Sequence, residues 1–153
     1  MRVNFTGKQI VLYYLLSLFF LASCTPLIGP YSPTAYQNAT SLKAETLALM
    51  SKATTPYALH EQKVAALMVD IDKAYEYVHG FPSNDLSAKQ WEILKKNDGN
   101  LLGKFFQRWK NEDTLKKEYI DEFKRIISDA FDEIICLEAN KKEATTCSRR
   151  GGK

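Results

Sequence analysis

The chain has 153 residues, which is the length of one ordinary domain. It contains 21 Lys and Arg residues and 18 Asp and Glu residues. The resulting net charge of +3 is too small for a typical nucleic-acid-binding protein. A hydrophobic content of 45% excludes an intrinsically disordered chain, and three cysteines are too few for a disulfide-built miniprotein.

An apolar run lies near the start of the chain, from residue 10 to residue 21, and follows a stretch that carries Arg2 and Lys8. As a helix this run spans about 18 Å, well short of the roughly 30 Å hydrocarbon layer of a membrane. A positive start, a short apolar core and small residues after it are typical of a secretory signal peptide. We therefore expect residues 1–23 to be a signal peptide that is removed.

The signal region ends with the residues Leu21-Ala22-Ser23-Cys24. This box resembles the lipobox of bacterial lipoproteins. The resemblance implies cleavage before Cys24, a diacylglycerol on its thiol and further fatty acid, such as palmitate, on its amine. It predicts a lipid anchor in the bacterial cell envelope. Thr25, which stands where some lipoproteins have Asp, resembles the group sorted to the outer membrane of Gram-negative cells, on its periplasmic or surface face. The alternative is a plain signal peptide or an uncleaved anchor with an incidental cysteine.

Behind the lipobox, three of the five prolines fall between residues 24 and 33, where they disfavour helix and predict a short extended tether. Residues 34–141 are the predicted folded domain, and residues 142–153 form a basic C-terminal tail. No segment of the domain alternates with a period of two, and β-branched residues are sparse. The fold class we expect is therefore all-α, as a small helical bundle or hairpin.

The first helix is predicted to be unusually long. Apolar residues recur at helical spacing from residue 33 to residue 79 and stay in phase across Pro56. We therefore predict one continuous helix over 33–79 that is kinked at the proline. The alternative is two helices, with Thr55 as the N-cap and Pro56 at the first helical position.

A second long helix is predicted at the C-terminal end, over residues 114–141. Its length is about 42 Å, whereas a continuous helix over 33–79 is about 70 Å long. The first helix would then overhang the bundle and expose part of its apolar stripe. The predicted partner-binding face consists of Leu42, Leu49 and Met50.

Two shorter helices are expected between the long ones. The residues Ser87-Ala-Lys-Gln90 match a capping box, which predicts that a helix starts there. On the next helix Phe105, Phe106 and Trp109 form an aromatic stripe, which we interpret as core packing rather than a membrane-surface face.

Candidate ligands for chemistry are few. His60 lies on the apolar arc, where a hydrogen-bonded core histidine is favoured over a metal or haem ligand. Glu76 and His79 have the Glu-x-x-His spacing of di-iron bundles, but a second such pair is lacking. Catalytic, phosphate-binding and haem-attachment motifs are also lacking. We expect no enzymatic activity, cofactor or metal.

The two cysteines outside the lipobox predict a disulfide. Cys136 falls on the polar side of its helix and Cys147 lies eleven residues further on, so the tail could turn back and pair them. Two unpaired thiols in a frayed tail are the alternative.

These patterns predict a lipid-anchored, non-enzymatic binding, adaptor or structural protein of the envelope. Its expected partners are the membrane, through acylated Cys24, and another envelope protein or a second copy, but not nucleic acid. The alternative is a carrier or sensor that holds an apolar ligand or haem within the bundle, near His60, Trp91 and Trp109.

Overall fold

The structure is a computed structural model that describes residues 29–96 and 101–141. In chain order the elements are α2 (Pro33–Met50), the 3-10 turn η1 (Tyr57–Leu59), α3 (Glu61–His79), α4 (Asp85–Lys95), α5 (Leu102–Glu112) and α6 (Lys117–Asn140). The described part of the chain contains no strand, so the prediction of an all-α fold is confirmed.

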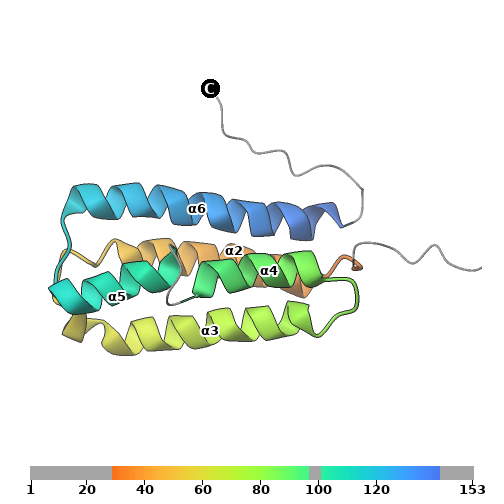
Figure 1. The fold of residues 1–153 in the computed structure, drawn as a ribbon, viewed down its shortest axis with the longest axis horizontal. Helices are drawn as coiled ribbons and strands as arrows, with labels where there is room; N and C mark the ends of the chain where they lie inside the picture. The colour runs from red at the N-terminus through yellow and green to blue at the C-terminus, as the bar shows by residue number, and fades with distance from the viewer. Residues whose placement is uncertain (1–28, 97–100, 142–153) are drawn as a thin grey trace, which may run out of the picture.

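The helices form an antiparallel bundle whose third member is divided into α4 and α5 (Figure 1). α2 packs against α3, α3 against α4, α4 against α6, and α6 returns to α2, which closes the ring. Each helix thus turns an apolar stripe to a common core. The first residues of α2, the α3–α4 turn and the last residues of α6 all lie at one end of the bundle (Figure 1).

The prediction of one continuous helix through Pro56 is wrong. α2 ends at Met50, and α3 begins at Glu61 and runs back antiparallel to α2 (Figure 1). The chain turns between them because its backbone bonds to the α5–α6 connection: Leu115 N–H donates to the Ala53 carbonyl at 2.7 Å. The apolar phase persists because both helices face the same core, which does not require them to be continuous.

The alternative of two helices is correct in outline but differs at the cap. Pro56, with φ −52° and ψ 133°, precedes the short η1 turn rather than opening an α-helix. The Thr55 hydroxyl donates to the Lys52 carbonyl at 2.6 Å and lies 2.8 Å from Nε2 of His60. Its side chain therefore stabilises the turn and does not cap a helix.

The predicted overhang and partner-binding face are also wrong. Leu42, Leu49 and Met50 are all at most 9% exposed and belong to the core between α2 and its neighbours. Once the chain turns back after Met50, α3 covers the stripe that a continuous helix would have exposed. These three side chains stabilise the fold and are not available to a partner.

Helix starts follow local chemistry only in part. Ser32 caps α2 as its hydroxyl accepts from the Ala35 N–H at 3.2 Å. α4 begins at Asp85 after Asn84, two residues before the predicted capping box, and Ser87 is buried.

The aromatic stripe on α5 is confirmed as core, since Phe105, Phe106 and Trp109 are all buried.

Candidate functional site

The chain enters the bundle through a close contact between Gly29 and the α3–α4 turn. The Gly29 N–H donates to the Ser83 carbonyl at 2.8 Å. A Cβ at residue 29 would lie 2.4 Å from Oδ1 of buried Asn84 and 3.1 Å from the Pro82 carbonyl oxygen. The absence of a side chain therefore permits this approach. Residues 29–33, which the sequence assigned to the tether, are part of the bundle.

A second contact fastens the same segment to α3. The Ser32 hydroxyl lies 3.0 Å from the Tyr77 hydroxyl, and the Tyr77 ring lies 5.1 Å from that of Phe81 in the turn. The segment that leads into α2 is thus bound to the α3–α4 turn at Gly29 and to the end of α3 at Ser32. We call this region the Gly29 end; it comprises residues 29–42, the turn 80–84 with the first turn of α4, and the last turn of α6, residues 137–141.

The Gly29 end presents little charge. Residues 29–42 and 80–84 contain no Asp, Glu, Lys, Arg or His. In the last turn of α6 the only charged side chains, Glu138 and Lys141, are 0% and 2% exposed and form a salt bridge of 2.6 Å. Because both side chains are buried, each charge needs the opposite charge of the other to offset its loss of water. The first turn of α4 adds one exposed carboxylate, Asp85, and the other exposed side chains at this end are mostly aromatic, apolar or neutral polar.

The opposite end of the bundle is held by hydrogen bonds around Trp109. The indole Nε1–H of Trp109 donates to the Thr55 carbonyl at 3.0 Å. The Tyr57 N–H donates to both the backbone oxygen and Oδ1 of Asp113, at 2.9 and 3.2 Å. Asp113 has φ 62° and ψ −41°, and the Thr114 N–H donates to the Glu112 carbonyl at 2.7 Å, so Asp113 is the central residue of a γ-turn. We call this region the Trp109 end.

The Trp109 end also contains the predicted ligand-binding histidine. The ring of His60 lies 5.3 Å from that of Trp109, and Tyr57 meets Trp109 edge-on at 5.5 Å. Nδ1 of His60 is buried without a hydrogen-bond partner. Trp91, the third predicted member of the ligand site, instead packs edge-on against Phe131 at 5.9 Å. The structure therefore brings together two of the three residues.

Charged pairs cover the outer surface of the bundle. A hydrogen bond from Lys89 and its charge lower the pKa of Glu92. At the Trp109 end, a hydrogen bond to Glu112 raises the pKa of Arg108, and a hydrogen bond to Asp121 raises that of Lys117. These groups are ionised at neutral pH and exposed, so they keep this part of the surface strongly hydrated.

The Glu-x-x-His pair lies on the exposed side of α3. His79 stacks on Tyr75 with ring centroids 5.3 Å apart, and Glu76 is exposed. Across residues 29–96 and 101–141, no three or more His, Cys, Asp or Glu side chains are grouped so as to hold a metal ion. In the same residues, no helix combines the length and the apolar character needed to span a membrane.

The predicted cysteine sites fall partly outside the described residues. Cys24 and Cys147 both lie outside them. Cys136, near the end of α6, is disulfide-bonded, and Nδ2 of Asn140 donates to its sulfur at 3.1 Å. The predicted disulfide requires that Cys136 be bonded, and it is. Its pairing with Cys147 stays a prediction.

No protein-family model, curated protein or solved structure matches this chain. Its function must therefore be inferred from its own residues.

Sequence reasoning missed the residues that build the two ends. Gly29 and Asn84 meet across a sequence distance that no local pattern reports. Asp113 accepts from the Tyr57 N–H, which is 56 positions away in the sequence, so no local pattern indicates this role either. One signal was readable in advance: the stretch from Thr25 to Leu42 carries no charge in a chain that is 25% charged.

Proposed function

We propose that the protein is a lipid-anchored, non-enzymatic component of the bacterial envelope that acts as a binding, adaptor or structural element through its helical surfaces. The observation that best supports this is the contact of Gly29 with the α3–α4 turn, where its N–H donates to the Ser83 carbonyl and it lies against Asn84. A folded bundle begins only five residues after the lipobox cysteine, Cys24, and is fastened there at one end. Such a design suits a body held close to a membrane.

The disulfide at Cys136 supports an oxidising compartment, because disulfides persist there and are rare in the cytosol. Non-reducing peptide mapping should find the Cys136 peptide linked to the Cys147 peptide. A link between Cys136 and Cys24 would contradict both this pairing and a lipid on Cys24, since one sulfur cannot carry both.

The surface that remains for a partner is the outer side of the bundle. On α2 only Tyr36 is exposed among the large apolar residues, and the others lie elsewhere, among them Val69 on α3, Ile93 on α4 and Ile126 on α6. They are spread singly among charged side chains, which is ordinary for a protein surface and marks no particular patch as the partner site. An adaptor role therefore relies on these helices and not on a projecting stalk.

The anchor can be tested by metabolic labelling with a palmitate analogue in a bacterial host. We expect the parent chain to be labelled and to fractionate with membranes, and Cys24→Ser to lose both properties. Cys136→Ser is the control, because it also replaces one cysteine by serine but leaves the lipobox intact; it breaks the disulfide at Cys136, which labelling of Cys24 does not require. Equal labelling of the Cys24→Ser chain, or an unlabelled parent, would refute the proposal.

A ligand carrier is a second candidate, and one observation favours it. Nδ1 of His60 is buried without a partner beside the Trp109 ring, so a small polar group of a ligand could satisfy it. Absorbance and native mass spectrometry of protein purified from its own host test this candidate. A ligand that is lost in His60→Phe would support it, and material with the bare chain mass would refute it.

A further inference from the structure

We propose that the Gly29 end of the bundle is a lipid-facing surface that rests in the headgroup region of the membrane carrying the anchor. The inference rests on the proposed function, because it takes acylated Cys24 as the point where the chain joins the membrane. It adds an orientation: the bundle stands on its Gly29 end, and the Trp109 end faces the aqueous side.

The length of the connecting chain makes the Gly29 end the nearest part of the bundle to the lipid. Five residue steps separate Cys24 from Gly29, and a fully extended chain covers about 17 Å over that distance. The 19 residues of α3 alone extend for about 28 Å away from this end. The hydrogen bond from Gly29 to the α3–α4 turn keeps this end beside the anchor.

The surface chemistry of the Gly29 end suits a headgroup layer. Its first segment and its turn contain no charged residue, the one ion pair in the last turn of α6 is buried, and Asp85 at the start of α4 is the single exposed charged side chain of this end. Dehydrating this end therefore costs little compared with dehydrating ionised side chains. In contrast, Phe81 in the turn and Leu86 at the start of α4 are 38% and 57% exposed and gain from leaving water.

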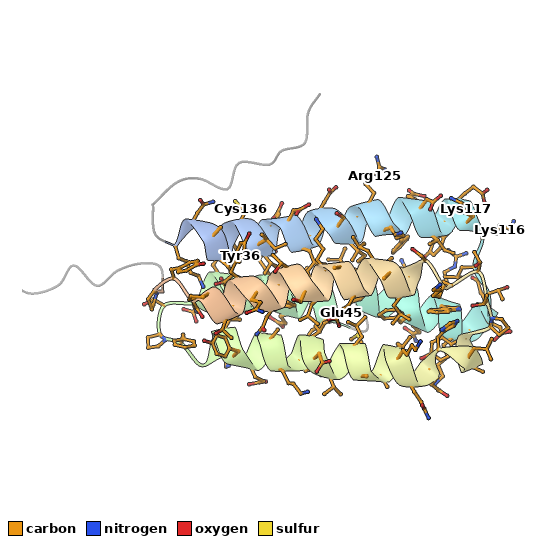
Figure 2. All side chains as sticks on the ribbon, turned by 180° about the vertical axis from the view of Figure 1, so that it is seen from behind. Tyr36, Glu45, Lys116, Lys117, Arg125 and Cys136 are labelled. Carbon is orange, nitrogen blue, oxygen red and sulfur yellow. The ribbon has the colours of Figure 1, made fainter. Side chains whose placement is uncertain are left out.

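Three tyrosines lie on or beside the segments that form this end, and one of them, Tyr77, packs against Phe81. Tyr36 is exposed on the first turns of α2 and lies at the same end as Cys136 (Figure 2). Tyr31 and Tyr77 are both half-buried, and the Tyr77 hydroxyl lies within hydrogen-bond distance of the Ser32 hydroxyl at the start of α2. Tyrosine favours the membrane–water boundary, where its ring is in an apolar layer and its hydroxyl is hydrated.

The Trp109 end has the opposite character. Figure 2 shows Lys116 and Lys117 at that end, away from Tyr36 and Cys136. The exposed charged residues there include Lys52, Glu61, Arg108, Lys110, Glu112, Asp113, Lys116 and Lys117. Placing this end in lipid would require dehydrating many ions at once.

The charge of the C-terminal sequence agrees with this orientation. α6 ends at the Gly29 end, and the sequence after Lys141 contains four basic residues and one acidic residue: Lys142, Arg149, Arg150, Lys153 and Glu143. Basic residues close to a bilayer are attracted to anionic headgroups. A basic tail that begins beside the anchor is therefore favourably placed.

Brominated phospholipids, which quench tryptophan only on contact, can test the orientation. The acylated full-length protein is purified with Phe81→Trp or, as the matched control at the Trp109 end, Leu59→Trp. Both positions are exposed, with Leu59 at 70%, so both variants should fold. Each is reconstituted into vesicles of phosphatidylcholine and phosphatidylglycerol with or without bromine on the acyl chains. The parent protein reports the background from buried Trp91 and Trp109.

We expect bromine to reduce the emission added by Phe81→Trp about twofold, as for a side chain seated at the headgroup–acyl boundary. The emission added by Leu59→Trp should be unchanged. An unquenched Phe81→Trp signal, or equal quenching at both positions, would overturn the orientation. The mass of the N-terminal peptide separates the two proposals: with acyl chains present, only the orientation fails, whereas a free Cys24 refutes the anchor and the orientation with it.

Discussion

The turn after Met50 can be tested by truncating Leu42, a side chain that the hairpin buries and a projecting helix would expose. Leu42 is part of the core where α2 packs against α3 and α6. Leu59, on η1, is the matched control because the same substitution there removes the same atoms from an exposed position. The comparison of Leu42→Ala with Leu59→Ala therefore isolates burial.

The size of the effect follows from the burial. Leu→Ala in a packed core costs about 2–5 kcal/mol, through the lost transfer free energy and the cavity left behind. Leu42 retains a little exposure and lies near the Gly29 end, so we expect about 2–4 kcal/mol at this position. At the exposed Leu59 the same change should alter the free energy of unfolding by about 0.5 kcal/mol or less. For a domain of this size the Leu42 effect corresponds to a melting temperature lower by roughly 10 °C.

Urea and thermal unfolding of the mature protein in detergent, followed by far-ultraviolet circular dichroism, measures both effects. The m-values of the variants should equal that of the parent, so that midpoints can be compared. If Leu42→Ala unfolds at the same urea concentration as Leu59→Ala, then Leu42 is not in a core and the antiparallel arrangement of α2 and α3 is refuted.

Three further predictions address single interactions. Trp109→Phe should destabilise the fold by about 1–2 kcal/mol more than Trp91→Phe, because only the Trp109 indole donates a hydrogen bond, and chemical denaturation of the two variants decides this. Lys141→Met should cost about 3–5 kcal/mol because it leaves the Glu138 carboxylate buried without its partner, whereas the double change with Glu138→Gln should recover most of the melting temperature. The lowered pKa of Glu92 means that its ion pair stabilises the fold above the pKa of the unfolded state and ceases to do so as pH falls. The difference in melting temperature between the parent and Glu92→Gln should therefore be small at neutral pH and shrink in acid; a difference that grows in acid would contradict this sign.

The helical segments could be predicted because their signal is local. The spacing of Leu67, Ile71 and Val78 on α3, or of Ile127 and Ile134 on α6, reports a buried stripe from neighbouring residues alone. Ser32 could likewise be predicted as a cap, because its hydroxyl bonds to a backbone group three residues away.

The turn near Pro56 could not be predicted in the same way. An apolar stripe in constant phase is compatible with one helix or with two helices facing one core, so the pattern does not distinguish them. Backbone hydrogen bonds across the bundle decide between them, from Leu115 to Ala53 and from Tyr57 to Asp113, and each joins residues more than fifty positions apart. Because these bonds hold the chain where it turns back, α3 packs on α2. Leu42, which was predicted to face a partner, therefore lies in the core.

The sequence by itself determined the helical class, the aromatic core of α5 and the small net charge, because composition and periodicity are properties of neighbouring residues. It also contained the lipobox-like Leu21-Ala22-Ser23-Cys24 and the uncharged stretch behind it. Only the tertiary structure decided what that stretch does. The fold brings Gly29 into contact with Asn84. It also places the start of α2, the α3–α4 turn and the end of α6 at one end of the bundle. A surface made from three distant segments exists only after the chain has folded, and for that reason no pattern along the chain reports it.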